Sequence, residues 1–588
     1  IDLDPNFADA HYNKANVLRK MGHTTEAIES FRLALRVEPK YTQALVNLAD
    51  ILEDANRYED ALSCYNSILE YEEKPSKFLA KRSDLFAKLG RYSEAVADLE
   101  IAASMDPMDP ALPFKKGVIY QELSDTTEAI SSFHTALKLK PDFVEAYNNI
   151  GAVLSSVGKD KEALDVYNAA LAIYQDVGEL HFNQANSLRS LGQYEQALES
   201  YNRAISIDSE NPEYFNNRGV AFHKLNRLSS ALSDYENAIE WNPEYIRAIN
   251  NRGLAFADTL KFDKALASYN RVIELNPDYA EAYWNKAILY LMHGHYLEGW
   301  RLFDWRLKMP GASTKYSFFD KPDWRGEEDI SDKCLFIPSE QGLGDLIQFS
   351  RYAAMAVGKA GEVILEVPKM LVPVIRTLHP EITLSIKGEK PPEFDVYCPV
   401  MSLPYAFRTT LETIPTNGKY LSSDGQKVSS WQEALGPTDK KRVGLVWSGS
   451  SKHENDHNRS IPLTELVPLL SDSVEWHSLQ KEYRETDLAV LESMPQVSQH
   501  QDALVDFSDT AALIDCLDLV ITVDTSVAHL AGALGKPVWI MLPHVPDYRW
   551  LTDRADSPWY DSVRLYRQHT AGDWAPLIER LSADLNEC

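Results

Sequence analysis

The sequence predicts an all-α repeat superhelix followed by two α/β domains, an α + α/β architecture. An alanine recurs every 34 residues through the first half of the 588-residue chain, and glycine-rich turns follow short apolar runs in the second half. The length also exceeds what a single hydrophobic core supports. We expect residues 1–309 to form the superhelix, 310–333 a linker, 334–425 the first α/β domain and 426–588 the second.

Two positions define each repeat. The alanine lets the two helices of a unit approach closely, and a bulky residue four positions later fills the groove against the next unit. A period of 34 with this pairing resembles the tetratricopeptide (TPR) helix pairs that stack into a superhelix. The alanines are Ala27, Ala61, Ala95, Ala129, Ala163, Ala197, Ala231 and Ala265, and the bulky residues are Phe31, Tyr65, Leu99, Phe133, Tyr167, Tyr201, Tyr235 and Tyr269.

Asparagine occupies the sixth position in seven of the nine units, and Lys81 and Lys115 interrupt the line. A carboxamide offers a donor and an acceptor to a peptide unit without selecting its side chains. The line resembles the asparagine ladder of the O-GlcNAc transferase superhelix, which holds an extended polypeptide; a consensus preference for asparagine is the alternative. The predicted peptide-binding residues are Asn13, Asn47, Asn149, Asn183, Asn217, Asn251 and Asn285.

Composition narrows the class of protein. The chain is 44% hydrophobic and 25% charged, as in soluble globular proteins, and its net charge of −28 argues against nucleic acid or anionic membranes as partners. No apolar run reaches about 18 residues, so we expect no membrane span, and the five cysteines lack metal-site spacing. We expect a cytoplasmic protein. Because the chain starts at Ile1 inside a repeat edge, a preceding segment stays open.

From residue 334 the helical period gives way to alternating strands and helices. The first series has a strand in KCLFIP, a glycine-rich turn into a helix in SEQGLGDLIQF, a strand in EVILEV and a helix in KMLVPVIRTL. The second series runs through RVGLVWSG, VEWHSL, LDLVITV and PVWIML. Such alternation indicates mainly parallel sheets. The loop-rich segment 420–441 predicts a hinge between the two series.

The motifs EQGLGD, GLVWSGS, SLQKE and VDTSVAHLAGALGKPVW together resemble the heptosyltransferases, glycosyltransferase family 9. The resemblance covers residues 334–568 and extends to bacterial proteins that fuse TPRs to such a domain. It implies a GT-B fold of two Rossmann-like domains. It also implies an inverting glycosyltransferase that uses a nucleotide-sugar donor and needs neither a metal ion nor another cofactor.

A candidate general base lies in the first glycine-rich turn. Asp345 follows Gly342 and Gly344 at the carboxyl end of a strand, where open α/β sheets place ligands. In the family this aspartate deprotonates the acceptor hydroxyl, which requires a carboxylate within hydrogen-bond reach of the nucleophile. A helix N-cap is the structural alternative for Asp345. Glu340 is the competing base.

The second domain holds the candidate donor-binding residues. Backbone N–H groups at the start of the helix after LDLVITV are suited to bind a diphosphate. The resemblance assigns Asp524, Thr525 and His529 to the nucleotide-sugar, and Ser526 offers a further hydroxyl. A protonated His529 would neutralise the leaving phosphate. The alternative reading makes Asp524 a cap and His529 a satisfied core histidine.

Further candidates flank this helix. Lys452 or Arg459 would stabilise the departing diphosphate, unless their loop is simply a solvated charged segment. Gln480 and Lys481 would touch the nucleotide base. Three tryptophans are candidate sugar-stacking platforms, although buried packing is the simpler reading; these are Trp324, Trp550 and Trp559.

The combined reading is a metal-independent inverting glycosyltransferase that moves a sugar onto a Ser or Thr hydroxyl of a protein held in the TPR groove. The resemblance suggests flagellin or another surface protein as the acceptor. A transferase acting on lipopolysaccharide or another glycan and a non-catalytic TPR scaffold are the alternatives. The sugar, the nucleotide, the acceptor site and the oligomeric state stay open.

Overall fold

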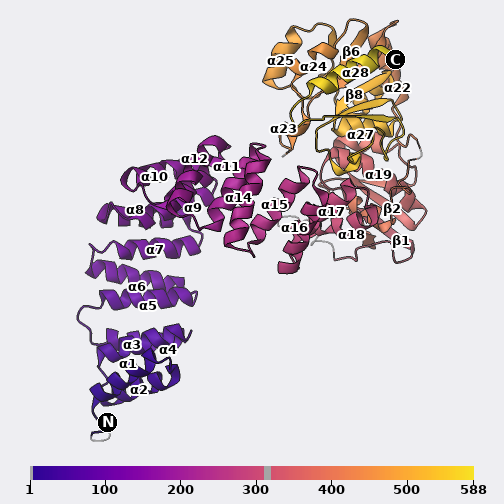
Figure 1. The fold of residues 1–588 in the computed structure, drawn as a ribbon. Coiled ribbons are helices and arrows are strands. Elements are labelled where there is room, and N and C mark those ends of the chain that lie inside the picture. The colour runs from indigo at the N-terminus through magenta and orange to yellow at the C-terminus, as the bar shows by residue number, and fades with distance from the viewer. Residues whose placement is uncertain (1–3, 310–319, 417, 454, 588) are drawn as a thin grey trace. The chain divides into compact units, whose positions relative to one another are not determined.

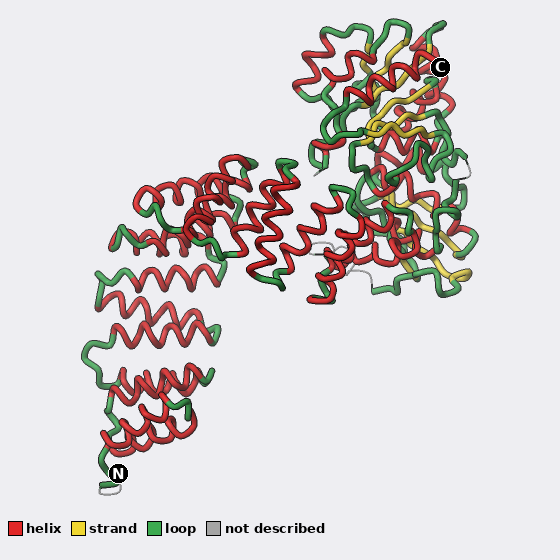
Figure 2. Tube along the Cα trace, viewed as in Figure 1, coloured by secondary structure: helices red, strands yellow, loops and turns green. Residues whose placement is uncertain are grey.

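The computed structural model describes residues 4–309, 320–416, 418–453 and 455–587, and the chain divides into two compact units, Ile1–Ala248 and Ile249–Cys588. Strands are drawn only in the second unit (Figure 2). The division differs from the predicted boundary at residue 309, because the last repeats pack with the α/β domains. Residues 310–319 of the predicted linker lie outside the described residues.

Helices in antiparallel pairs make up the first unit (Figure 1). They are α1 (Ala8–Lys20), α2 (Thr24–Val37), α3 (Thr42–Asp54), α4 (Tyr58–Leu69), α5 (Ser76–Lys88), α6 (Tyr92–Met105), α7 (Ala111–Glu122), α8 (Thr126–Leu139), α9 (Val144–Ser156), α10 (Asp160–Ile173), α11 (Gly178–Ser190), α12 (Tyr194–Ile207), α13 (Pro212–Lys224) and α14 (Leu228–Trp241), and α15 (Ile246–Ala257) crosses the division. Each helix is short, so packing between helices supplies most of their stability.

The packing predicted for the repeats is confirmed. Every repeating alanine is fully buried at 0% exposure, and the bulky residues four positions later are at most 1% exposed. Each ring also contacts the small eighth residue of its own unit: a Cβ added to Gly151 would lie 2.3 Å from the Tyr167 ring, and one added to Gly219 would lie 2.7 Å from the Tyr235 ring. The helices of a pair therefore approach as closely as the small residues allow.

The ninth repeat docks onto the α/β domains. It comprises α17 (Ala280–Met292), α18 (Tyr296–Phe303) and the 3₁₀ turn η1 (Asp304–Lys308), after α16 (Phe262–Leu275). Trp300, 1% exposed, meets the rings of Phe349 in the first domain and of Tyr548 and Trp559 in the second. One indole thus joins the end of the repeat array to both domains.

The first α/β domain has a four-stranded parallel sheet in the order β3-β2-β1-β4. The strands are β1 (Ile330–Ile337), β2 (Ala360–Val367), β3 (Ile382–Ile386) and β4 (Val396–Tyr397). Helix α19 (Leu343–Val357) crosses from β1 to β2. The helix predicted in KMLVPVIRTL is only a 3₁₀ turn η2 (Lys369–Leu371) and α20 (Val372–Ile375), because Pro373 lacks an N–H and suits only a first turn.

The second domain has a six-stranded parallel sheet in the order β10-β9-β8-β5-β6-β7. The strands are β5 (Lys441–Val446), β6 (Val474–Ser478), β7 (Val497–Gln499), β8 (Leu519–Val523), β9 (Val538–Leu542) and β10 (Val563–Arg567). The order reverses between β5 and β8, which is the arrangement of a Rossmann fold and its ligand-binding switch point. The predicted α + α/β class is confirmed.

The predicted hinge contains a helix. Asp424 accepts hydrogen bonds from the N–H groups of Gln426 and Lys427 and caps α22 (Gly425–Leu435), a cap missed in the loop-rich reading of this segment. The remaining helices are η3 (Val400–Ser402), α21 (Leu403–Ala406), α23 (Asp456–Arg459), α24 (Leu463–Leu466), η4 (Val467–Leu469), α25 (Glu485–Glu492), α26 (Phe507–Asp515), α27 (Ser526–Ala533), η5 (Tyr548–Trp550) and α28 (Ala575–Glu587). None of the helices in the described ranges combines the length and the apolar character needed to cross a membrane.

The close packing at the eighth position predicts the effect of adding one methyl group. Gly151→Ala places a carbon against the Tyr167 ring, so we expect a loss of about 1 kcal/mol after the gain in helix propensity is subtracted. Gly178→Ala is the control, because the nearest atom to its added Cβ is 3.4 Å away. Urea unfolding followed by circular dichroism compares the two variants; equal stability of Gly151→Ala and wild type would contradict this packing.

Candidate functional site

The candidate donor-binding residues gather where the order of the second sheet reverses. All five residues of β8 are buried, because a central parallel strand is covered on both faces. Asp524 and Thr525 follow β8 directly, and Ser526 begins α27. The Thr525 side chain does not cap the helix but lies 3.2 Å from the Thr522 hydroxyl. The first N–H groups of α27 thus point outward without a Thr525 cap, as an anion site requires.

Arg459 joins the loops that follow β5 and β8. Its guanidinium donates a hydrogen bond of 3.0 Å to the Asp524 carbonyl and packs so closely on Gly449 that an added Cβ would lie 2.4 Å away. Its Nε atom is buried and lacks a hydrogen-bond partner among the described residues, and the Asp456 carboxylate lies 3.8 Å from it. The cation therefore lies at the switch point with a donor to spare.

The remaining residues predicted to contact the donor, which are Gln480, Lys481 and Lys452, differ from Arg459 in their contacts or exposure. Gln480 is buried and exchanges hydrogen bonds with the backbone of Ser448, so it supports the loop after β5 rather than presenting a free amide. Lys481 is exposed and donates to the Gln501 carbonyl. Lys452 lies on the exposed part of the loop after β5. Of the two loop cations, Arg459 is the one at the carboxyl end of β8.

His529 is a neutral, buried imidazole. Its Nδ1 lies 3.0 Å from the Tyr560 hydroxyl, its Nε2 lies 3.9 Å from Asp524, and its ring stacks on the Trp550 indole. Burial and the nearby Arg549 and Arg351 guanidinium groups lower the pKa of His529 well below its ordinary value. Burial and two neighbouring cations thus act against the protonated His529 that the sequence suggested.

The pKa of Asp524 is shifted upward, in contrast to that of His529. Burial and the neighbouring Asp547 carboxylate raise the pKa of Asp524 to about 6, against the opposing effect of Arg549. A carboxyl group with such a raised pKa gains a proton at a higher pH than an ordinary aspartate does, and in the protonated form it does not repel an anion. Asp524 is therefore compatible with a phosphate site.

The first glycine-rich turn brings Asp345 to the N-terminal end of α19, next to the start of α27. Gly342 precedes α19, and its N–H donates a hydrogen bond of 2.7 Å to the Asp345 carboxylate. A Cβ on Gly344 would lie 2.9 Å from His529 and 3.4 Å from Ser526, so α19 and α27 touch at their N-terminal ends and lie side by side (Figure 1). The predicted base and the predicted donor helix thus meet across the two domains.

Glu340, the competing base, is held in a buried ion pair. The Arg306 guanidinium of η1 donates to both Glu340 oxygens, at 3.1 and 2.5 Å, and the Met401 N–H donates to one of them. Arg306 also donates to Asp304 and to the Ser402 hydroxyl. Both oxygens of Glu340 are therefore engaged, and its role is to anchor the turn that leads to Asp345.

Several residues of the site have no counterpart among the sequence predictions. Arg549 of η5 donates to Asp345, to Asp547 and to the Gln348 side chain. Arg351 donates to the carbonyls of Pro415 and Trp559 and so links the two domains. The segment around Arg549 carries no motif, and its partner Asp345 is 204 residues away, so no local signal identifies it.

The three candidate sugar platforms are packed in the interior. Trp550 lies against His529, Trp559 lies against Trp300, and Trp324 lies against Phe407. Their exposures are 0%, 1% and 5% respectively. The simpler reading, buried packing, therefore applies to each.

The asparagines of the repeats link neighbouring units. Asn183 donates to Asn148, at 2.6 Å, and Asn217 donates to Asn186, at 3.0 Å. Corresponding bonds of Asn47 to Asn16 and of Asn285 to Asn250 measure 2.9 and 3.2 Å. Asn13 is exposed, whereas Asn149 and Asn251 are half-buried like the other four. One such bond uses one of the two amide hydrogens. The Asn47 amide also donates to the Tyr12 hydroxyl, at 3.1 Å, and the Asn217 carbonyl oxygen accepts from Asn216, at 2.9 Å.

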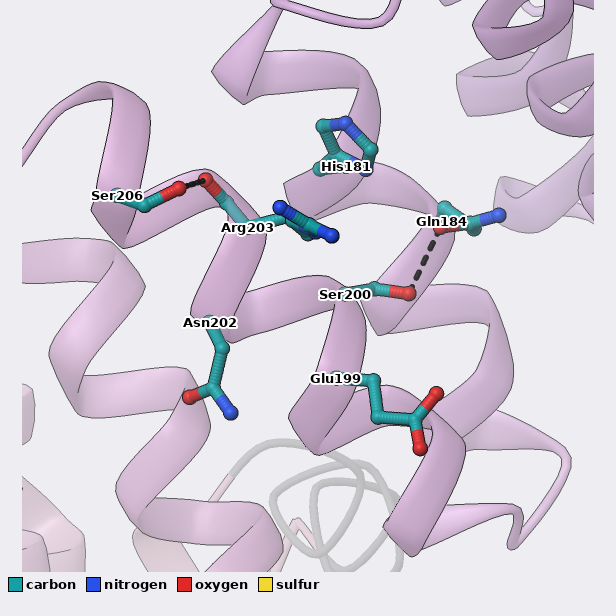
Figure 3. A pocket seen from close by; sticks show the side chains of 7 residues that line it. All are labelled: His181, Gln184, Glu199, Ser200, Asn202, Arg203 and Ser206. Carbon is teal, nitrogen blue, oxygen red and sulfur yellow. Dashed lines mark hydrogen bonds between the residues drawn. The ribbon is translucent and has the colours of Figure 1, made fainter.

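A separate cavity of about 520 Å³ lies on the sixth repeat (Figure 3). The Ser200 hydroxyl donates to Gln184 at its edge, at 2.7 Å. No predicted peptide-binding asparagine lines the cavity, so the asparagine line and the cavity are distinct features of the array. The lining residues are His181 and Gln184 of α11 and Glu199, Ser200, Asn202, Arg203 and Ser206 of α12.

Comparison with known families covers both halves of the chain. TPR models match residues 12–77, 81–130, 114–177, 185–226, 212–245 and 261–294. The model of glycosyltransferase family 9 (heptosyltransferase) matches residues 497–541. That segment runs from β7 to β9 and includes Asp524, Thr525, Ser526 and His529. The chain therefore carries TPRs over most of its first half, and the segment that contains the candidate donor helix is similar to family 9.

Individual relatives match only parts of the chain. Protein FlbA of Caulobacter vibrioides is 28% identical over 329 residues, which cover 51% of this chain and 54% of FlbA, so the chain spans about half the length of this curated relative. Among solved structures, YrrB is 24% identical and covers 31% of this chain and 95% of its own, with a TM-score of 0.28. A TPR protein of Cytophaga hutchinsonii is 17% identical. The match covers 41% of this chain and 98% of that protein, with a TM-score of 0.35. Neither structural likeness supports a functional conclusion.

The buried pair of Arg306 and Glu340 predicts a stability effect. Arg306→Met leaves the Glu340 carboxylate buried without its cation, and we expect a loss of about 3–5 kcal/mol. The double variant Arg306→Met with Glu340→Met should recover most of that loss, because no charge remains unpaired. Tryptophan fluorescence during urea unfolding checks this, since every tryptophan except Trp241 lies in the C-terminal unit. Equal loss in both variants would contradict the pairing.

Proposed function

We propose that the protein is a glycosyltransferase of the GT-B type that inverts configuration and needs no metal ion. The observation that carries the proposal is the meeting of α19 and α27 at their N-terminal ends, with Asp345 on one helix and an N-terminus without a side-chain cap on the other. The family 9 segment, which contains α27, supports a nucleotide-sugar as the ligand of that terminus.

The diphosphate of the donor would bind the N–H groups at the start of α27. The helix dipole and the Arg459 guanidinium there stabilise negative charge. The Thr525 and Ser526 hydroxyls add donors. His529 stays neutral and positions α27 through its contacts with Tyr560 and Trp550. Positive charge for the leaving group therefore comes from arginine and from backbone dipoles.

Asp345 acts as the general base in this proposal. It takes the proton from an acceptor hydroxyl as the hydroxyl oxygen forms a bond to the anomeric carbon of the sugar. The bond from that carbon to the diphosphate breaks, and the nucleoside diphosphate leaves with the electron pair. A single displacement of this kind inverts the anomeric configuration. Asp345 is preferred to Glu340 because Asp345 lies in the first turn of α19, which contacts α27, whereas Glu340 is paired with Arg306 of the repeat array.

The TPR array would recruit a protein acceptor whose Ser or Thr hydroxyl receives the sugar in the cytoplasm. An extended backbone would compete with the present side-chain partners for the amide donors and acceptors of the asparagine line. Binding there raises the effective concentration of the acceptor near Asp345. Flagellin or another surface protein is the acceptor that we would test first.

Binding of nucleotides tests the donor site. Calorimetry with UDP, GDP, ADP and CMP should find one nucleotide that binds wild type. Arg459→Gln should weaken that binding about tenfold, because a charge-assisted hydrogen bond contributes about 1.5–3 kcal/mol, and His529→Ala should weaken it by undermining α27. Arg580→Gln, an exposed change on α28, is the control and should bind normally. Binding of none of the four nucleotides would argue for a non-catalytic scaffold.

Transfer to purified flagellin tests the asparagine line. Asn217→Ala combined with Asn251→Ala should raise KM for the acceptor about tenfold and leave kcat unchanged, because two hydrogen bonds of about 0.5–1.5 kcal/mol are lost and neither side chain takes part in the proposed chemistry. The rate of donor hydrolysis without acceptor should stay the same. Unchanged KM would show that the acceptor binds elsewhere.

A further inference from the structure

Arg549 is a buried cation shared by three side chains. Its residue is 7% exposed, its Nε donates to the Gln348 amide oxygen at 2.6 Å, and its Nη1 donates to Asp547 at 2.7 Å. Its Nη2 donates to Asp345 of the other domain. Because Asp345 is the proposed base, the same guanidinium that joins the domains also pairs with the carboxylate that must accept a proton.

Arg549 also lies next to a residue that contacts α27, the candidate donor helix. The next residue, Trp550, stacks on His529 of α27 with ring centroids 5.4 Å apart. The Arg549 charge acts on both His529 and Asp524, lowering the pKa of each. Besides Asp345, then, the cation has Asp547 and Asp524 as neighbours, so acidic groups already outnumber it there.

One polar group beside Arg549 has no partner. Gln348 is 0% exposed, its amide oxygen accepts from Arg549, and its Nε2 finds no hydrogen-bond partner among the described residues. A buried amide nitrogen without an acceptor costs about 1–3 kcal/mol. An acceptor-rich ligand such as a diphosphate would supply what the amide lacks.

We propose that Arg549 is a donor-responsive latch on the base. Without donor, its guanidinium pairs with the Asp345 carboxylate and occupies an oxygen that the acceptor hydroxyl would otherwise contact. The diphosphate of the donor then competes for the guanidinium and for the Gln348 amide. As Arg549 turns toward the phosphate oxygens, Asp345 is released to accept the proton of the acceptor hydroxyl. This inference rests on the proposed donor site.

The latch makes Asp345 an internal competitor of the donor. Two anions cannot both fully use one guanidinium fork, so the charge on Asp345 weakens diphosphate binding through Arg549. By the reciprocity of linked equilibria, the donor weakens the hold of Arg549 on Asp345 by the same factor. Donor binding therefore precedes productive deprotonation of the acceptor, and Arg549 acts as a positioning residue for the base.

Four proteins test this by calorimetry with UDP, GDP and ADP: wild type, Asp345→Asn, Arg549→Gln and the double variant. We expect Asp345→Asn to bind the preferred diphosphate about tenfold more tightly and Arg549→Gln to bind it about tenfold more weakly. In the Arg549→Gln background, Asp345→Asn should no longer tighten binding. If Arg549→Gln does not fold, Arg549→Lys replaces it, and the tightening should shrink because lysine lacks the fork.

The outcomes separate the latch from simpler explanations. Unchanged or weaker binding by Asp345→Asn overturns the latch. Tightening that persists in the Arg549→Gln background also overturns it, because simple charge repulsion between Asp345 and phosphate then suffices. If wild type binds none of the three nucleotides, the donor site itself fails and the latch fails with it. Nucleotide binding without the predicted coupling leaves the proposed function intact.

Discussion

The α/β domains depend on the direct contact between Gly344 and His529. Only a residue without a side chain lets the first turn of α19 reach α27, since a Cβ there would lie 2.9 Å from the imidazole. The contact aligns two helix N-termini from different domains, whose dipoles both favour negative charge. The partial positive charges of two neighbouring helix N-termini repel each other. Acidic side chains lie beside these termini, and negative charge is stabilised there.

Buried arginines then hold this arrangement in place. Arg549 and Arg351 link the two domains through Asp345 and through backbone carbonyls, and Arg306 carries the end of the repeat array into the first domain. Each buried guanidinium is matched by several acceptors, because an unpaired charge in such surroundings would cost several kcal/mol. The geometry of the candidate site and the attachment of the last repeat to the first domain thus depend on the same kind of interaction.

The repeat array uses small and aromatic residues for packing and amides for linkage. The alanine and aromatic positions are uniformly buried, which leaves little freedom for variation there. The sixth-position amides bond to the preceding repeat, as Asn183 does to Asn148, and that bond uses one of the two hydrogens of the Asn183 amide. A structural role in the array and a recruiting role are therefore compatible in the same side chains.

Much of the architecture follows from local sequence patterns, as do the candidate donor helix and the turn that contains Asp345. The 34-residue period determined the helix pairs, and alternating apolar runs and glycine-rich turns determined the parallel sheets, because each pattern acts over a few turns or one strand. Asp524, Thr525 and Ser526 were identifiable because they follow a strand and open a helix. Even the alternative reading of Asp345 as a local capping group proved partly right, since it accepts from Gly342.

Tertiary structure alone decided which of these residues are charged, paired or free. Glu340 and Asp345 look equivalent in sequence, yet Arg306 engages one and Arg549 holds the other. The neutrality of His529 follows from burial beside two arginines, and Arg549 meets Asp345 across 204 residues. Such pairing and desolvation depend on contacts between distant segments, and no local pattern records which distant segment will lie against a given side chain.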